Sequence, residues 1–445
     1  MQSIKSILSR LLILNKNILI EGFWPLVSNF TIIILNILTI KIITNFVSSD
    51  NYGKANLTIG ILLLLNSLII GPLMVAHNRL YFNYINKSKV KWYKKYFKTI
   101  IIKGIIIVLS LYLFIALFYY INGNKLYITY FTPLILLGIV TPFFSEKTDY
   151  IEAHRQQKKL AFINNFQKLL YPLLVFLLIS FSLNQITSFI LAQSLSFLIV
   201  ILFVRESKES LELQRAEKLD GYNQKEEIKE LYKEILSFGW YLPLGNFLMW
   251  LLTTSDRYFL DHFRSAHEVG IYALNYGLWS MPFLILNGWL EVWTRPHIYD
   301  KASKNEWTKL KNIIIKRLML GSFLGFVIII IIFISANIIS HLLLSHDYII
   351  DNKIIVLIII AHFFQMVGYS ILPIYISGKN LKNNFIALLF AASFNFVFNL
   401  VLIPEYGLYG AAFSTLIGYI IWSTILAIGL FNFKNKLYIQ KNKYS

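Results

Sequence analysis

The chain alternates between long apolar stretches and short polar segments over nearly its whole length. A bilayer core about 30 Å thick is crossed by roughly 20 helical residues. Only helices and closed barrels satisfy their backbone groups in hydrocarbon, and these continuous apolar runs lack the alternation of barrel strands. The pattern therefore predicts an all-α, polytopic membrane protein with twelve transmembrane helices, at 22–46, 55–77, 99–121, 127–146, 160–182, 185–204, 237–262, 269–293, 318–341, 354–377, 384–403 and 408–431.

The composition agrees with a membrane protein. Hydrophobic residues make up 56% of the 445 residues and charged residues only 15%, too few charges to cover the surface of a soluble domain. The formal net charge of +19 would also suit a nucleic-acid-binding protein, but the distribution of the charges argues against that class. Cysteine is absent, so disulfides and thiolate metal sites are excluded.

The positive charges follow a topology pattern. Of the 42 Lys and Arg residues, 34 fall in alternate loops and the termini, five in the other loops and three within predicted spans. The first set includes Lys316 and Arg317, which immediately precede the ninth predicted span. Because cytoplasmic loops are enriched in Lys and Arg, we expect both termini in the cytoplasm and the chain in the inner (cytoplasmic) membrane. Membrane lipids are then expected partners, and nucleic acid is not.

A charged segment divides the chain into two halves. Residues 205–235 carry many charges of both signs and favour a helix, and six predicted spans lie on either side. We expect an N-terminal six-helix lobe at 1–204, a cytoplasmic linker at 205–235, and a C-terminal six-helix lobe with a short cytoplasmic tail at 236–445.

The two halves also share sequence. At an offset of 217 residues, nine identities fall within the 39 positions from 22 to 60, including the pair Gly53 and Gly270. Composition alone would give about three or four identities. Both halves begin on the same side of the membrane. The repeat therefore predicts two pseudo-symmetric lobes related by an axis along the membrane normal, with a substrate site between them near the midplane.

Short motifs connect the chain with a known family. The sequence reads DRYFL at 256–260, EVGIYAL at 268–274, SDNYGKA at 49–55 and PEYGLYGAA at 404–412. These segments resemble bacterial polysaccharide flippases, the Wzx-like exporters of O-antigen (lipopolysaccharide) and capsule, which share the MOP superfamily with MATE drug exporters and the lipid II flippase. The resemblance implies a MATE-like fold, alternating access, a polyprenyl-pyrophosphate-linked oligosaccharide as substrate, and other polysaccharide assembly proteins as partners.

Motifs for catalysis are missing from the sequence. It contains no Gly-rich phosphate loop, metal-binding helix or nucleophile elbow, so we do not expect an enzyme that hydrolyses ATP. No catalytic residue, metal site or cofactor is therefore expected, and an ion gradient is the remaining source of energy.

Ionisable residues within the spans are the candidate site residues, because charge in hydrocarbon usually faces a bundle interior or a water-filled cavity. Lys41 lies in the first span, and Asp256 and Arg257 lie at a similar depth in the seventh. The repeat places these charges on lobes that face each other, which favours a shared cavity. Two alternatives stay open: Lys41 could snorkel to the surface, and Arg257 could pair with Asp261 four residues later.

Two further spans contribute candidates. Lys168 stands in the fifth span beside polar residues that include Asn164, and such a cluster is expected to line the cavity. His362 lies near the middle of the tenth span. A midplane histidine could titrate near neutral pH and, together with Asp256, couple transport to an ion gradient. A neutral, hydrogen-bonded packing role is the favoured alternative for His362.

The resemblance and the residues together predict a flippase. Lys41, Lys168 and Arg257 would attract the anionic pyrophosphate while the lipid tail stays in the bilayer beside the protein. A MATE-like drug/ion antiporter is the alternative, although an organic cation would need acidic rather than basic residues in the cavity. A membrane glycan polymerase or ligase is less favoured, because the external connections are too short to bind a lipid-linked donor.

Overall fold

The computed structural model describes residues 16–86, 89–154, 156–204, 224–237, 241–377 and 381–431. Within these ranges the regular elements are helices, and each of the predicted spans overlaps one of them. The elements before the predicted linker are α2 (Lys16–Phe46), α3 (Ser49–Asn86), α4 (Val90–Ile121), α5 (Leu126–Thr129), α6 (Phe131–Ala153), α7 (Gln157–Ser180) and α8 (Gln185–Phe203). Those that follow are α10 (Gln224–Ser237), α11 (Tyr241–Phe263), α12 (Ala266–Ser303), α13 (Trp307–Leu343), η1 (His346–Tyr348), α14 (Asn352–Ser377), α15 (Leu381–Tyr406) and α16 (Leu408–Phe431).

Ten of the described helices are long and apolar enough to cross a membrane. Helices α6 and α11 fall short, and both carry ionisable side chains along their length, such as Glu146 and Lys147 in α6 and Asp256 and Arg257 in α11. The chain is an all-α, multi-pass membrane protein, as predicted. Twelve crossings remain a prediction.

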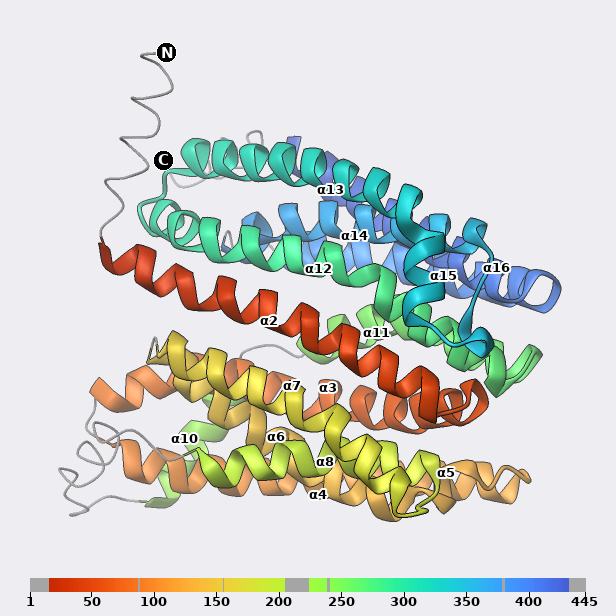
Figure 1. The fold of residues 1–445 in the computed structure, drawn as a ribbon. Coiled ribbons are helices and arrows are strands. Elements are labelled where there is room, and N and C mark those ends of the chain that lie inside the picture. Colours follow the sequence, from red (N-terminus) through yellow and green to blue (C-terminus); the bar gives the residue numbers. More distant parts are fainter. Residues whose placement is uncertain are drawn as a thin grey trace.

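The helices form two groups that lie side by side (Figure 1). In the first group, α2 to α8, helix α2 packs along α7 and α3 packs along α4. In the second group, α11 to α16, helices α14 and α15 both pack against α16. The groups meet mainly where α3 lies against α11 and α12, and α2 also touches α12. The central contact therefore joins α3 to α12.

Helices α3 and α12 are counterparts in the sequence repeat. Each is 38 residues long, and both their first and their last residues are separated by the offset found in the sequence. Helices α2 and α11 likewise end at Phe46 and Phe263, an identical pair at that offset. The two halves therefore share helix boundaries as well as identical residues at this offset.

The bundle has two different ends (Figure 1). At one end, which we call the short-loop end, residues 47–48, 264–265 and 407 join successive helices. At the other, the basic end, helices are joined around 87–89, 154–156 and 304–306, close to lysines such as Lys89 and Lys304.

Helix α10 covers part of the predicted linker. It is tied to the first group at the basic end, where Lys89 Nζ lies 2.5 Å from Glu227 Oε1 and Lys103 Nζ donates to Tyr232 OH at 3.2 Å. Residues 205–223 of the linker and the predicted tail at 432–445 lie outside the described residues.

Candidate functional site

The two helix groups touch backbone to backbone at the short-loop end. A Cβ built on Gly270 would lie 1.8 Å from the Ser49 carbonyl oxygen, and one built on Gly53 would lie 1.9 Å from the Ala266 carbonyl oxygen. No side chain fits into such a contact, so only glycine permits α3 and α12 to approach this closely. The repeat partners Gly53 and Gly270 therefore meet each other on the line between the groups.

Polar contacts reinforce this closed end. The Ser49 backbone N–H donates to Asp347 Oδ2 at 2.9 Å, and Ser49 Oγ lies 2.5 Å from His267 Nδ1. Partial burial raises the pKa of the Asp347 carboxyl, but the hydrogen bonds from Ser49 and the nearby rings of His267 and His346 lower it more. Its pKa therefore lies below the ordinary value, and the carboxylate is the form that binds Ser49.

Helices α3 and α11 are joined further along their length. Tyr258 OH donates to the Leu57 carbonyl oxygen at 2.9 Å, and Asn246 Nδ2 donates to the Ser67 carbonyl oxygen at 2.7 Å. Both bonds run from the second group to the first, so the contact between the groups extends from the short-loop end into the bundle.

Lys41 contacts a helix end. Its Nζ donates to the Leu342 carbonyl oxygen at 2.7 Å, and Thr44 Oγ1 donates to the Leu343 carbonyl oxygen at 3.2 Å. The last carbonyls of a helix lack partners within that helix and attract cations. Lys41 therefore caps α13 from α2 in this conformation, and its predicted place in a substrate cavity remains a prediction.

Asp256 and Arg257 point to different surroundings. Asp256 is 1% exposed, and its Oδ2 accepts a hydrogen bond from Thr415 Oγ1 of α16 at 3.2 Å. The Arg257 guanidinium is half-buried and lies 5.8 Å from the ring centre of Tyr276. Within the described ranges it has no hydrogen bond or ion pair, and the alternative pair with Asp261 is not formed. The half-buried Arg257 thus keeps N–H donors that no described residue accepts.

His362 belongs to the same neighbourhood. It is 1% exposed, its Nδ1 lies 2.7 Å from the Ile358 carbonyl oxygen, and its ring meets that of Tyr276 at a centroid distance of 4.5 Å. Its Nε2 is buried and has no partner among the described residues. Arg257 and His362 therefore contact the same tyrosine ring, and the structure brings these two candidates together.

A hydrogen-bonded chain continues from this tyrosine into the second group. Tyr276 OH and Tyr419 OH are 2.7 Å apart, and Gln365 Nε2 donates to Tyr419 OH at 2.7 Å. These bonds connect α12, α14 and α16 in the interior of the second group. The sequence showed Gln365 one helical turn from His362 but gave no sign of the tyrosine pair, because its members lie far apart in the chain.

Asn164 and Lys168 lie on α7 of the first group, one helical turn apart. Their neighbours are engaged: Asn165 Oδ1 accepts from Ser28 Oγ at 3.1 Å, and Gln167 Nε2 donates to Ser196 Oγ at 2.9 Å. Asn164 and Lys168 are half-buried and have no hydrogen-bond partner in the described part of the chain.

Aromatic rings lead from this face of α7 towards Arg257. Tyr171, one turn beyond Lys168, and Tyr52 of α3 both meet the ring of Phe189, at centroid distances of 5.6 and 5.3 Å. Tyr52 in turn lies within electrostatic range of Arg257. The structure shows no direct contact between Lys168 and Arg257, so the two cations remain separate within one aromatic-lined region.

Arg317 was misplaced by the sequence pattern. It is not a loop residue: it lies within α13, fully buried, with Nη1 2.5 Å from Glu291 Oε2 and 3.0 Å from Thr294 Oγ1. Its Nη2 donates to Asn287 Oδ1 at 3.1 Å. The error arose because α13 begins about three turns before its apolar run, so Lys316 and Arg317 resembled the end of a loop. Paired in this way, Arg317 joins α12 to α13.

Comparisons with known proteins agree on family and fold. The family described as polysaccharide biosynthesis protein matches residues 18–294, and no curated protein matches the chain. The fold is similar to that of the lipid II flippase MurJ in an inward closed conformation, with TM-score 0.67 and 16% identity over 93% of this chain and 87% of that one.

Two MATE transporters give similar values. An inward-facing multidrug resistance transporter of the MOP superfamily has TM-score 0.67 and 12% identity over 94% of this chain and 100% of its own. The Vibrio cholerae transporter VcmN has TM-score 0.66 and 14% identity over 95% of this chain and 97% of its own. At such identities the likeness concerns the fold, which is MATE-like.

Proposed function

Because this chain belongs to the polysaccharide biosynthesis protein family and has the fold of MOP superfamily transporters, we propose that it is a flippase for polyprenyl-pyrophosphate-linked oligosaccharides. A transporter is not an enzyme, so its task is to carry the polar glycan across hydrocarbon without changing its bonds. The lipid tail can remain in the bilayer beside the protein during this movement.

The observation that carries this proposal is the state of Arg257. A guanidinium binds phosphate oxygens through paired N–H donors. This one belongs to a half-buried residue, lies over the Tyr276 ring and within electrostatic range of Tyr52 on the first group, and makes no hydrogen bond or ion pair in the described ranges. Asn164 and Lys168 would add donors from the first group. Together they would replace water around a pyrophosphate held between the groups.

The two ends of the bundle differ in a way that supports alternating access. The short-loop end is closed by the backbone contact of Gly53 with Gly270 and by the bond from Ser49 to Asp347. At the basic end the groups are linked by an exposed pair, with Arg295 Nη1 3.6 Å from Glu152 Oε1. Exposed ion pairs contribute at most about 1 kcal/mol, so the basic end should open more readily.

We further propose twelve crossings with both termini in the cytoplasm, two six-helix lobes at 1–204 and 236–445, and a location in the cytoplasmic membrane. The basic end would then face the cytoplasm, as the distribution of Lys and Arg favours. Substrate made in the cytoplasm would enter at that end and leave at the short-loop end. Other polysaccharide assembly proteins would receive it there.

Ion coupling at Asp256 and His362 is part of the same proposal. Asp256 is the buried carboxylate beside Arg257, and the side chains that form hydrogen bonds with it, Thr415 and Tyr272, are neutral. A cation or proton that reaches Asp256 would neutralise the negative charge next to Arg257. The attraction of Arg257 for the pyrophosphate would therefore increase. If this is correct, Asp256→Asn should make transport insensitive to an imposed ion gradient, while an unchanged gradient dependence would exclude Asp256.

The function is tested in cells that depend on this protein for surface polysaccharide. Arg257→Ala should abolish surface polysaccharide at normal membrane levels of the protein, and Arg257→Lys should restore part of it because the charge is kept. Arg264→Ala is the matched control, because Arg264 follows α11 directly and is exposed. Normal polysaccharide in the Arg257→Ala strain would remove Arg257 from the site.

A further inference from the structure

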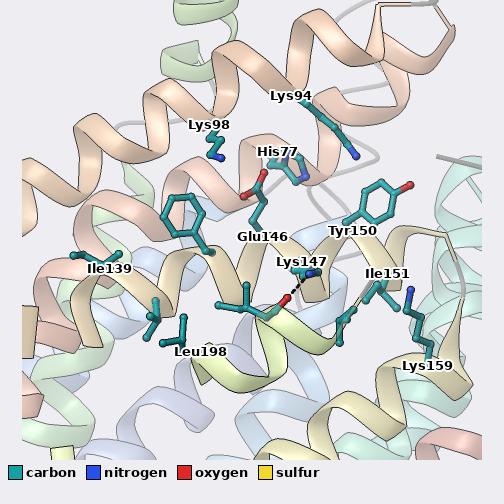
Figure 2. Close-up of a pocket in the computed structure, with 14 residues that line it drawn as sticks. His77, Lys94, Lys98, Ile139, Glu146, Lys147, Tyr150, Ile151, Lys159 and Leu198 are labelled. Atoms are coloured by element: carbon teal, nitrogen blue, oxygen red, sulfur yellow. Dashed lines mark hydrogen bonds between the residues drawn. The ribbon is translucent and has the colours of Figure 1, made fainter. Parts of the chain in front are cut away.

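A cavity lies within the first helix group, apart from the contact between the groups (Figure 2). Its volume is about 430 Å³, and its lining comes from α3, α4, α6, α7, α8 and the residue that follows α8. Neither α2 nor any element of the second group contributes to it. It is therefore separate from the proposed route of the oligosaccharide.

Cationic side chains from three helices converge on this cavity. Lys94 and Lys98 come from α4, Lys147 from α6 and Lys159 from α7, and Glu146 supplies the one carboxylate among the described lining residues. Figure 2 shows these side chains arranged around the same space. The described part of the lining thus contains four lysines and one glutamate, an excess of cationic side chains. Such an excess selects an anion.

Two of these lysines have contacts with uncharged groups. Lys94 Nζ lies 4.5 Å from the ring centre of Tyr150, and Lys147 Nζ donates to the Ile201 carbonyl oxygen at 2.6 Å. Rings and carbonyls orient an ammonium group without cancelling its charge.

The remainder of the lining is apolar. Ile139, Phe143, Leu198 and Ile201 form part of this wall, and Ile139 is 37% exposed. Lys98 is also exposed, so the cavity is open at the surface of the protein. A free inorganic anion would gain nothing from an apolar wall, whereas an amphiphile would contact both parts of the cavity.

We propose that this cavity binds the phosphate headgroup of an anionic membrane phospholipid, with the start of an acyl chain against the apolar wall. Basic pockets between transmembrane helices at the basic side of a membrane protein suit such headgroups. A bound lipid would join α4, α6, α7 and α8 at the basic end of the first group. The site is independent of the proposed flippase activity.

The test is lipid binding by the purified full-length protein in detergent, measured by native mass spectrometry. Phosphatidylglycerol should bind at least tenfold more tightly than phosphatidylcholine of the same chain length. The double variant Lys94→Gln/Lys98→Gln should lose that preference. The matched control Lys125→Gln/Lys353→Gln changes two lysines at the short-loop end and should keep it. Equal binding of the two lipids, or an unchanged preference in the cavity variant, would overturn the proposal.

Two further arms separate the sources of phosphate and guard against misfolding. Millimolar glycerol phosphate should fail to displace phosphatidylglycerol; complete displacement would show a site for free phosphate rather than for lipid. Lys159→Gln on α7 and the charge-keeping Lys98→Arg supply independent variants, with loss of preference expected in the first and retention in the second. A preference for phosphatidylglycerol that is kept in Lys159→Gln and lost in Lys98→Arg would contradict the proposed lipid site, even if the double variant does not fold.

Discussion

Asp256 and Arg257 are adjacent in α11 but experience opposite surroundings. The carboxylate turns into the second group and is hydrogen-bonded by Thr415, whereas the guanidinium lies over Tyr276 at the boundary with the first group. The sequence places both at the depth of a cavity. Successive residues of a helix point about 100° apart, so the two side chains must face different neighbours. Which neighbouring helix each side chain meets depends on the packing and cannot be predicted from the periodicity of α11.

Arg317 illustrates a different limit of sequence reasoning. Charge counting assigned it to a loop, but its partner Glu291 lies on another helix, and only the packing of α12 on α13 brings them together. Lys41 is similar, since the carbonyl that it caps belongs to a helix about 300 residues further along the chain. The hydropathy and charge pattern of one segment does not predict its contacts with a distant segment.

The Arg317 pair gives a prediction for stability. Arg317→Ala would leave the partly buried Glu291 carboxylate without its partner, which typically costs roughly 3 kcal/mol. The midpoint of thermal unfolding in detergent should fall clearly, whereas Arg295→Ala, an exposed arginine of the same region, should change it little. Replacing both members, as Arg317→Met with Glu291→Leu, should recover most of the loss. A midpoint for Arg317→Ala equal to that of the Arg295 control would contradict the structural role.

Asp347 gives a prediction for pH. Its folded pKa lies below the ordinary value of about 4, so its bond to Ser49 contributes fully above that value and is lost as pH falls through the lower folded pKa. The short-loop end should therefore stay equally closed at pH 8 and pH 6. Asp347→Asn should loosen it at both.

The absence of native cysteine makes this measurable. Spin labels on Lys125→Cys and Lys353→Cys report the distance between the two groups at the short-loop end. A distance that widens between pH 8 and pH 6 in the wild-type background would show that groups other than Asp347 control the closure.

For the individual helices, the sequence predicted which ones form but not how long they are. Apolar runs marked every described spanning helix, yet α3, α12 and α13 extend well past the predicted spans 55–77, 269–293 and 318–341. These extensions carry polar and charged residues such as Arg295, Lys301 and Lys309, and there hydropathy no longer distinguishes helix from loop. The observed boundaries of α3 and α12 instead correspond to each other at the offset of 217 residues between the halves.

The contact between α3 and α12 gives a prediction at this scale. Gly270→Ala would place a methyl carbon into the Ser49 carbonyl, and overpacking of this kind costs about 1–3 kcal/mol. The labelled distance at the short-loop end should increase. Gly277→Ala is the control on the same helix, because its added Cβ would meet no atom within 4 Å. Equal distances in the two variants would show that the backbone contact does not hold this end closed.

For the molecule as a whole, the sequence predicted a polytopic membrane protein, its family and the MATE-like fold. Long apolar runs, a repeat and short motifs can be recognised in a sequence without knowing which residues are in contact. The sequence did not show which candidate charges meet. In the structure Arg257 and His362 both contact Tyr276. Lys168 of α7 has no direct contact with Arg257, and Lys41 donates to a carbonyl oxygen at the end of α13. That selection depends on how the two groups pack.

The proposed topology can be checked on the whole chain. Single cysteines at Lys125 and Lys353 should react with a membrane-impermeant thiol reagent in intact cells, whereas cysteines at Lys301 and Lys304 should react only after lysis. The reverse pattern would invert the protein in the membrane. Reaction of all four in intact cells would require a different number of crossings.

The most direct measurement of the central claim is translocation by the purified protein in sealed proteoliposomes. A fluorescent polyprenyl-pyrophosphate-linked oligosaccharide is placed in both leaflets, and a lectin added outside captures the accessible glycan. Capture should rise from the outer-leaflet share to nearly all of the glycan with the wild-type protein, and should stay at the outer-leaflet share with Arg257→Ala. Capture equal to that of protein-free vesicles, together with exchange of an organic cation, would contradict it and identify a drug antiporter.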